Sequence, residues 1–158
     1  MKRLLLFCLL GTTLVGLLPA QKAPATSGNK SEAAVISAVT QVVAAFNDRG
    51  PVTLLFTKDA DYVDAQGVWI KGIDEIEPAR QHQFATDLKA AHATVKDVKV
   101  RLLKPDVAIA HVTCEVSGML SANQETLPPH NELSTLVLVK QKGKWLVASV
   151  QEAHGTER

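Results

Sequence analysis

The spacing of apolar residues in this chain of 158 residues is mainly helical in the first part and alternating in the second. From residue 98 onward, apolar and polar side chains alternate in runs that are separated by turn residues or, over residues 121–130, by a polar loop, which is typical of the strands of an antiparallel sheet. The runs span residues 98–102, 107–120, 133–140 and 145–152. Because strands joined by short turns lie side by side, this half of the chain predicts a meander.

The half of the chain before these runs has helical spacing, interrupted by one short hairpin. Ser31 is a candidate N-cap for a first helix, whose apolar residues recur through Asn47. Pro51 suits the first turn of a short second helix over residues 52–56, and apolar residues step by four along a third helix over residues 76–88. Three helices and a long meander predict an α+β domain in which one curved antiparallel sheet folds over the helices.

The hairpin between the predicted helices contains the first candidate site. Residues 60–65 alternate, so that Tyr62 and Asp64 share one face of a strand. Gly67 tolerates the positive φ of a tight turn, and Trp69 lies in the returning strand. A carboxylate next to aromatic side chains and under a helix is typical of the wall of a small-molecule cavity.

The amino terminus predicts a secretory signal peptide. Two basic residues at positions 2 and 3 precede an apolar run over residues 4–18 and a small residue at Ala20. Cleavage after Ala20 fits this pattern best, and residues 23–25 offer a second cleavage site. We therefore expect a secreted or periplasmic protein with no membrane attachment after cleavage, made of a signal peptide (1–20), a flexible linker (21–30) and one domain (31–154).

Charge and cysteine content exclude several classes of function. Loss of residues 1–20 leaves 15 of the 17 basic side chains against 16 acidic ones, so no basic field for a nucleic acid is expected. Cys114 becomes the single cysteine, which predicts no disulfide. No nicotinamide, flavin or phosphate-loop motif occurs, and we expect no cofactor.

Histidine spacing gives no metal motif. The five histidines include no pair at H-x-H or H-E-x-x-H spacing. A metal site would have to be assembled from segments that are distant in sequence, and none is predicted.

Three segments carry a resemblance to a known family. They are Asp59-Ala-Asp-Tyr-Val-Asp64 with Gly67, Trp69 and Lys71-Gly72; Asp106-Val-Ala-Ile-Ala-His111-Val-Thr; and Gly143-Lys-Trp145-Leu-Val-Ala. These segments resemble the SnoaL-like or SgcJ/EcaC-type branch of the nuclear transport factor 2-like superfamily, over residues 31 to about 151. The resemblance implies a conical, cystatin-like α+β barrel with a pocket between sheet and helices, and a homodimer formed through the sheet. Relatives include isomerases, cyclases, dehydratases, binding proteins and oligomerisation domains, so the resemblance does not select an activity.

Asp64 is the first catalytic candidate. The resemblance places it where ketosteroid isomerases carry the general base for enolisation, and a carboxylate in an apolar cone suits proton transfer. The residues leave a second role open, because an aspartate that ends a strand often accepts hydrogen bonds from the following turn. The helix tyrosine that would stabilise an oxyanion in those isomerases is not recognisable here.

His111 is the second catalytic candidate. The alternation directs His111 away from the apolar face and toward a dimer interface, whereas the resemblance allows a pocket role. Arg80 stands where the SgcJ/EcaC-type pattern commonly has a histidine; it either binds an anionic group, pairs with Asp64, or is a solvated helix residue. Together with Arg80, the ligand-binding candidates are the aromatic residues Tyr62, Trp69 and Phe84.

These observations predict an exported, dimeric domain that binds a small, largely apolar molecule in the cone. The alternative is a cofactor-free isomerase, cyclase or hydro-lyase that uses Asp64 as base, assisted by His111 or Arg80. A structural homodimerisation module is the third hypothesis.

Overall fold

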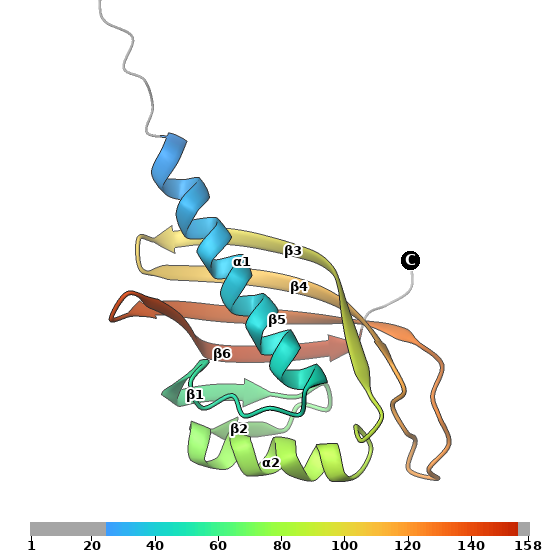
Figure 1. Ribbon diagram of the computed structural model, residues 1–158. Helices are drawn as coiled ribbons and strands as arrows, with labels where there is room; N and C mark the ends of the chain where they lie inside the picture. The colour runs from blue at the N-terminus through green and yellow to red at the C-terminus, as the bar shows by residue number, and fades with distance from the viewer. Residues whose placement is uncertain (1–24, 155–158) are drawn as a thin grey trace, which may run out of the picture.

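The computed structural model describes residues 25–154, so the predicted signal peptide lies outside the described residues. This range contains two helices and six strands (Figure 1). They are α1 (Ala25–Asn47), β1 (Phe56–Val63), β2 (Trp69–Lys71), α2 (Ile73–Ala85), β3 (His92–Lys104), β4 (Val107–Ser117), β5 (His130–Gln141) and β6 (Lys144–His154). Neither of these helices has the length and apolar character needed to cross a membrane.

The six strands form one sheet in the order β2-β1-β6-β5-β4-β3. The predicted meander is confirmed, since β3 to β6 pair antiparallel in sequence order. The expectation of a purely antiparallel sheet is wrong at one place, because β1 pairs parallel with β6. In Figure 1 the sheet is curved, α1 crosses it over β3 to β6, and α2 lies beside β1 and β2.

The predicted hairpin is confirmed, and its turn has the expected backbone. Strand β1 pairs antiparallel with β2, with Tyr62 opposite Ile70. The amide of Gly67 donates to the carbonyl of Asp64 at 3.0 Å, and Gly67 has a φ of 85°. Glycine adopts this positive φ without steric cost, which explains the reversal at this point.

The expectation of three N-terminal helices is wrong, because residues 52–56 form a single turn. The amides of Leu55 and Phe56 both donate to the carbonyl of Val52, and Phe56 already begins β1. One turn fixes several backbone dihedrals for few hydrogen bonds, so it does not extend into a helix unless packing favours it. Here the sheet competes, since the carbonyl of Leu55 accepts a hydrogen bond from Val147 of β6 at 2.9 Å.

Several element boundaries differ from those expected. Helix α1 begins at Ala25, upstream of the predicted cap at Ser31, so the end of the predicted linker is helical. Strand β3 begins at His92 and β5 at His130, both earlier than the alternation predicted. The earlier start of β5 adds His130 and Glu132 to the end of the sheet, which is where the candidate site lies.

The core lies between the helices and the covered face of the sheet. Its largest fully buried side chains are Val35 and Val39 of α1, Ile76 of α2, Leu138 of β5, Val147 of β6 and Val52. Each such side chain stabilises the fold by about 1.5–3 kcal/mol relative to an exposed one. Toward the carboxyl end of α1, Val43 and Phe46 pack against a second apolar cluster and also line a cavity.

Candidate functional site

Two adjoining cavities lie between the sheet and the helices. The inner cavity has a volume of about 90 Å³ and a mostly apolar lining from α1 and the sheet, including Val39, Val42, Phe56, Val112 and Leu136. The outer cavity has a volume of about 80 Å³ and is lined by the turn after β1, by α2 and by the ends of β5 and β6. Both are lined by Phe46, Tyr62, Arg80, Val116, Glu132 and Glu152. An apolar cavity is therefore joined to a more polar one through a group of ionisable side chains.

Arg80 lies at this junction because of its place on α2. The helix buries residues at a spacing of three or four, namely Ile73, Ile76, Arg80 and Phe84. The Arg80 side chain is therefore directed inward, with a residue exposure of 7%, and it is not a solvated helix residue. Its guanidinium carbon lies 5.1 Å from the centroid of the Phe84 ring, which lines the outer cavity.

Two nitrogen atoms of the Arg80 guanidinium have unused hydrogen-bonding capacity within the described part of the chain. Its Nε and Nη2 atoms are buried without a hydrogen-bond partner among the described residues. Burial lowers the pKa of Arg80, which nevertheless stays a cation at neutral pH. The site thus presents unused donors and a positive charge at the point where the two cavities meet.

Tyr62 and Glu152 face Arg80 from the neighbouring strands β1 and β6. Tyr62 pairs with Val150, and Glu152 lies two residues further along β6 on the same face. Burial raises the pKa of Glu152 to about 7, while the hydrogen bond from Tyr62 and the charge of Arg80 act in the opposite direction. Burial and the adjacent Glu152 raise the pKa of the Tyr62 hydroxyl well above its usual value.

Asp64 lines the outer cavity, and its carboxylate also accepts hydrogen bonds from the turn that follows β1. Its Oδ1 atom accepts hydrogen bonds from the amides of Gln66 at 2.9 Å and Val68 at 2.8 Å. This geometry is the turn-forming role that the sequence left open. The carboxylate also borders the space that contains Arg80.

We expect the turn role of Asp64 to be visible in stability. Asp64→Ala removes both hydrogen bonds and should lower the free energy of unfolding by about 1–2 kcal/mol. Asp64→Asn keeps an oxygen at the same position and should cost less than about 0.5 kcal/mol. Urea denaturation of the two variants measures both values, and equal destabilisation by alanine and asparagine would contradict the turn role.

Two of the sequence-predicted site residues lie away from both cavities. Trp69 is 57% exposed, and its Nε1 donates to Asp61 at 2.9 Å while the Lys71 ammonium lies 3.7 Å from its ring centroid. His111 is exposed on β4, with Nδ1 at 3.1 Å from Oγ1 of Thr135. The structure therefore brings together Asp64 and three of the four ligand-binding candidates, Tyr62, Arg80 and Phe84.

Glu132, His130 and His154 were not predicted as site residues from the sequence, and Glu152 had no predicted role. A signal for the first two was present, because counting by two from the buried Leu136 of β5 reaches Glu132 and His130 on the same face. Polar residues on the covered face of a strand indicate a site, since burying them without partners is unfavourable.

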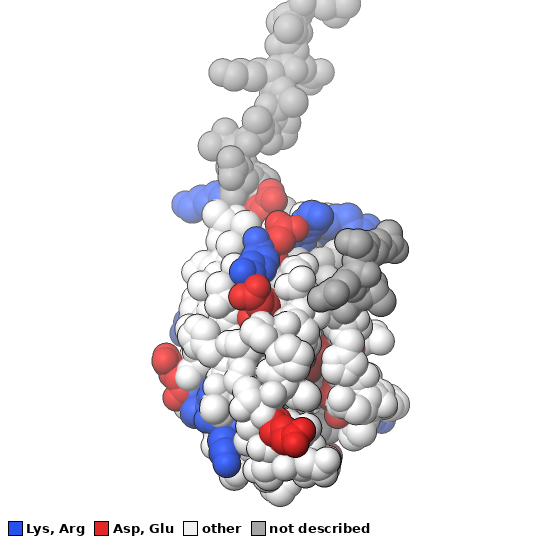
Figure 2. Space-filling view, turned by 90° about the vertical axis from the view of Figure 1, so that its right-hand side faces the viewer, with Lys and Arg blue, Asp and Glu red and all other residues white. Residues whose placement is uncertain are grey.

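The end of the molecule near this site has mixed charge. Figure 2 shows a face on which uncharged residues predominate, with Lys and Arg side chains interspersed with Asp and Glu in its upper part and at the lower left. On this face no extended basic field is present that would attract a nucleic acid.

No protein-family model matches the chain, and no curated protein matches it. Solved structures do match. An uncharacterised protein with a cystatin-like fold from Caulobacter vibrioides has a TM-score of 0.74 and 20% identity, covering 80% of this chain and 91% of that chain. A nuclear transport factor 2-like protein of unknown function from Pseudomonas putida has a TM-score of 0.67 and 16% identity, and the match covers 82% of this chain and 89% of that chain. A hexachlorocyclohexane dehydrochlorinase from Novosphingobium barchaimii has a TM-score of 0.72 and 11% identity, and the match covers 82% of this chain and 90% of that chain. The chain has the cystatin-like or nuclear transport factor 2-like fold, which enzymes and proteins of unknown function share.

Proposed function

We propose that this chain is an exported, small-molecule-binding domain of the SnoaL-like type. The inner cavity holds the apolar part of the ligand, and Arg80 binds an oxygen of the ligand that accepts hydrogen bonds. The observation that carries the proposal is the buried guanidinium with unused donors between the two cavities. A buried donor without a partner costs roughly 1–3 kcal/mol, and a ligand oxygen at this point would recover that cost.

The chemistry around Arg80 narrows the ligand class. The apolar lining of the inner cavity suits a hydrocarbon body, and the few convergent polar groups suit one polar head. Arg80 lines both cavities beside Glu132 and Glu152. Its positive charge opposes a cationic head, whereas a carbonyl or carboxylate oxygen can accept hydrogen bonds from its N–H groups. A carboxylate also meets repulsion from ionised glutamates, which a neutral carbonyl avoids.

Three probes of equal chain length test this ligand class. Hexan-2-one offers a neutral acceptor, hexanoate an anionic acceptor, and hexylammonium a cation without an acceptor. We expect hexan-2-one and hexanoate to raise the melting temperature in a concentration-dependent way, because a ligand that binds only the folded state stabilises it by mass action. Hexylammonium should have no effect. Stabilisation by hexylammonium equal to that by the acceptors would contradict the role of Arg80, and stabilisation by none of the three would favour a structural module.

A cofactor-free isomerase, cyclase or hydro-lyase with Asp64 as base is the second candidate. It is supported by the position of Asp64 at the same outer cavity as Arg80. The dehydrochlorinase supports an enzymatic function only in that an enzyme with the same fold exists. His111 faces away from the cavities, which leaves Arg80 as the assisting residue. Asp64→Asn separates the two functions, since a binding domain should keep its ligand affinity within a few fold, whereas an enzyme of this type should lose turnover and keep its fold.

A further inference from the structure

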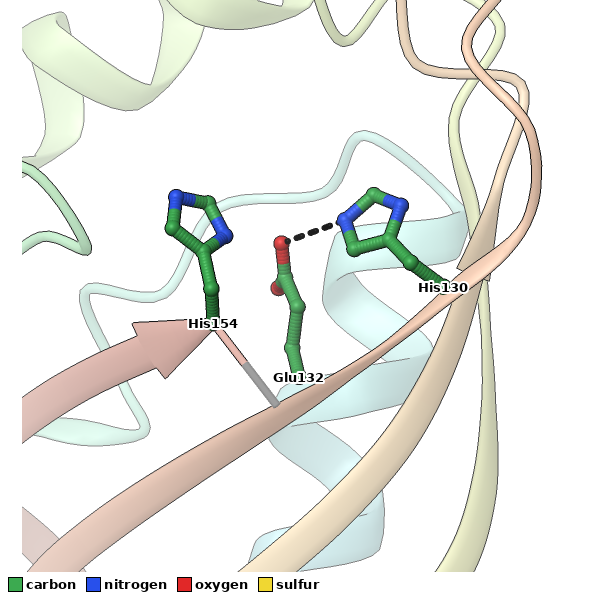
Figure 3. Close-up of side chains that lie close together, drawn as sticks. All are labelled: His130, Glu132 and His154. Atoms are coloured by element: carbon green, nitrogen blue, oxygen red, sulfur yellow. Dashed lines mark hydrogen bonds and ion pairs between the residues drawn. The ribbon is translucent and has the colours of Figure 1, made fainter. Parts of the chain in front are cut away.

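Three potential metal ligands lie together beside the outer cavity, and two of them, Glu132 and His154, line it. His130 and Glu132 extend from β5, and His154 extends from the end of β6 (Figure 3). Each offers one ligand atom, and these atoms lie within 4.8 Å of one another. We propose that His130, Glu132 and His154 form a binding site for a first-row divalent metal ion, for which zinc is the best match.

The strand pairing places these side chains together. Glu132 and His154 are direct partners in the antiparallel pair of β5 and β6. His130 precedes Glu132 by two residues and therefore lies on the same face of β5. Strands joined by backbone hydrogen bonds hold the three Cα atoms in place, so the site needs only side-chain rotations to close around an ion.

One ligand separation already fits a tetrahedral ion. The Nε2 atom of His130 and the Oε1 atom of Glu132 are 3.3 Å apart. Zinc bonds of about 2.1 Å at tetrahedral angles separate neighbouring ligand atoms by roughly 3.4 Å. His154 is exposed, so its ring is free to rotate toward the other two groups. In Figure 3 both imidazole rings and the carboxylate extend from the same side of the paired strands.

A second hydrogen bond orients His130 as a ligand. Its Nδ1 atom lies 3.2 Å from the carbonyl oxygen of Pro128. A carbonyl oxygen only accepts, so Nδ1 carries a hydrogen and Nε2 faces Glu132. With Nδ1 as the donor, the Nε2 lone pair and the Glu132 carboxylate oxygen are two acceptors that can bind the same cation. Histidine ligands commonly donate their other ring N–H to a backbone carbonyl in this way.

The ligand set indicates both the ion and its surroundings. Two imidazoles and one carboxylate are ligands of zinc, and three protein ligands leave a further coordination position, as in catalytic zinc sites. The same set also binds iron(II), whereas calcium and magnesium prefer oxygen ligands only. Glu132 and His154 line the outer cavity, so a small molecule there has access to an ion at this site.

Titration of the untagged protein with zinc and cobalt(II), with no organic ligand present, tests the site. We expect one ion per chain by calorimetry and visible absorption bands of tetrahedral cobalt(II). Loss of residues that merely orient a ligand costs 10–100-fold in metal affinity, so Glu132→Gln and His154→Asn should each cost at least about tenfold. His82→Asn and Glu75→Gln on α2, both exposed and outside the cluster, are matched controls that should leave the affinity unchanged.

Two outcomes would overturn the metal site. Unchanged zinc affinity in Glu132→Gln and His154→Asn would show that the ion binds elsewhere. Absence of zinc and cobalt binding in the unsubstituted protein would show an ion pair only between His130 and Glu132. Because the titration contains no organic probe, its failure leaves the role of Arg80 in ligand binding intact, and failure of the probe series leaves the metal site intact.

Discussion

Replacement of Gly118 by alanine is expected to lower the free energy of unfolding by about 3 kcal/mol or more, since two penalties add. Gly118 follows β4 and has a φ of 74°, a conformation that side chains with a Cβ rarely adopt. A Cβ atom at this position would collide with the carbonyl oxygen of Ala90 and lie 3.0 Å from its carbonyl carbon. Both of these are backbone atoms, so the clash is relieved only by moving the segment that precedes β3 away from the residue that follows β4.

Gly143→Ala is the matched control for this prediction. Gly143 has a φ of 83°, and a Cβ atom there would have nothing within 4 Å. Its replacement should therefore lower the free energy of unfolding only by the cost of holding a residue with a Cβ at positive φ, about 1–2 kcal/mol. Urea denaturation of both variants measures the difference between their free energies of unfolding. If Gly118→Ala is no more destabilising than Gly143→Ala, then the contact with Ala90 relaxes at little cost and the prediction is wrong.

The parts of the fold that the sequence predicts are those with a local cause. Alternation predicted the meander, and the turn chemistry around Gly67 predicted the hairpin. Spacing by four placed Ile76, Arg80 and Phe84 on one face of α2, where the structure has them buried. The short helix over residues 52–56 was mispredicted because local spacing ignores the competing hydrogen bond to β6. The parallel pairing of β1 with β6 has no local signal, since the two strands are far apart in sequence.

The candidate site was harder to predict because one strand changes its inward face. In β6, Trp145 and Val147 are buried, and counting by two from them reaches Gln151. The pairing with β5 shifts between Val137 and Leu138, which leaves an extra residue on β6 at Ala148. A β-bulge of this kind reverses which side chains point inward, so Val150, Glu152 and His154 share the covered face instead. Without the register, Glu152 and His154 are indistinguishable from solvated residues at the end of a strand.

Arg80→Met is expected to weaken the binding of hexan-2-one and hexanoate at least about tenfold without destabilising the fold. Methionine has a similar reach and no donors, so the variant loses the hydrogen bonds from a charged group to the ligand oxygen. Such bonds contribute about 1.5–3 kcal/mol, which corresponds to an affinity loss of about 10- to 150-fold. The free energy of unfolding should stay the same or rise by about 1 kcal/mol, because a buried charge with unsatisfied donors is replaced by an apolar side chain.

Ligand titration monitored by melting temperature, together with urea denaturation, measures both effects of Arg80→Met. Arg101→Met, at an exposed arginine of β3, is the control and should change neither. Arg80 also faces the negative charges of Glu77 and Glu152, which favour its charged form and are an alternative reason for its burial. If those charges hold Arg80 for structural reasons, Arg80→Met will instead lose more than about 2 kcal/mol of stability, because the glutamates are left without a counter-charge. Unchanged stability with lost binding would therefore show that this arginine is retained for the ligand and not for the fold.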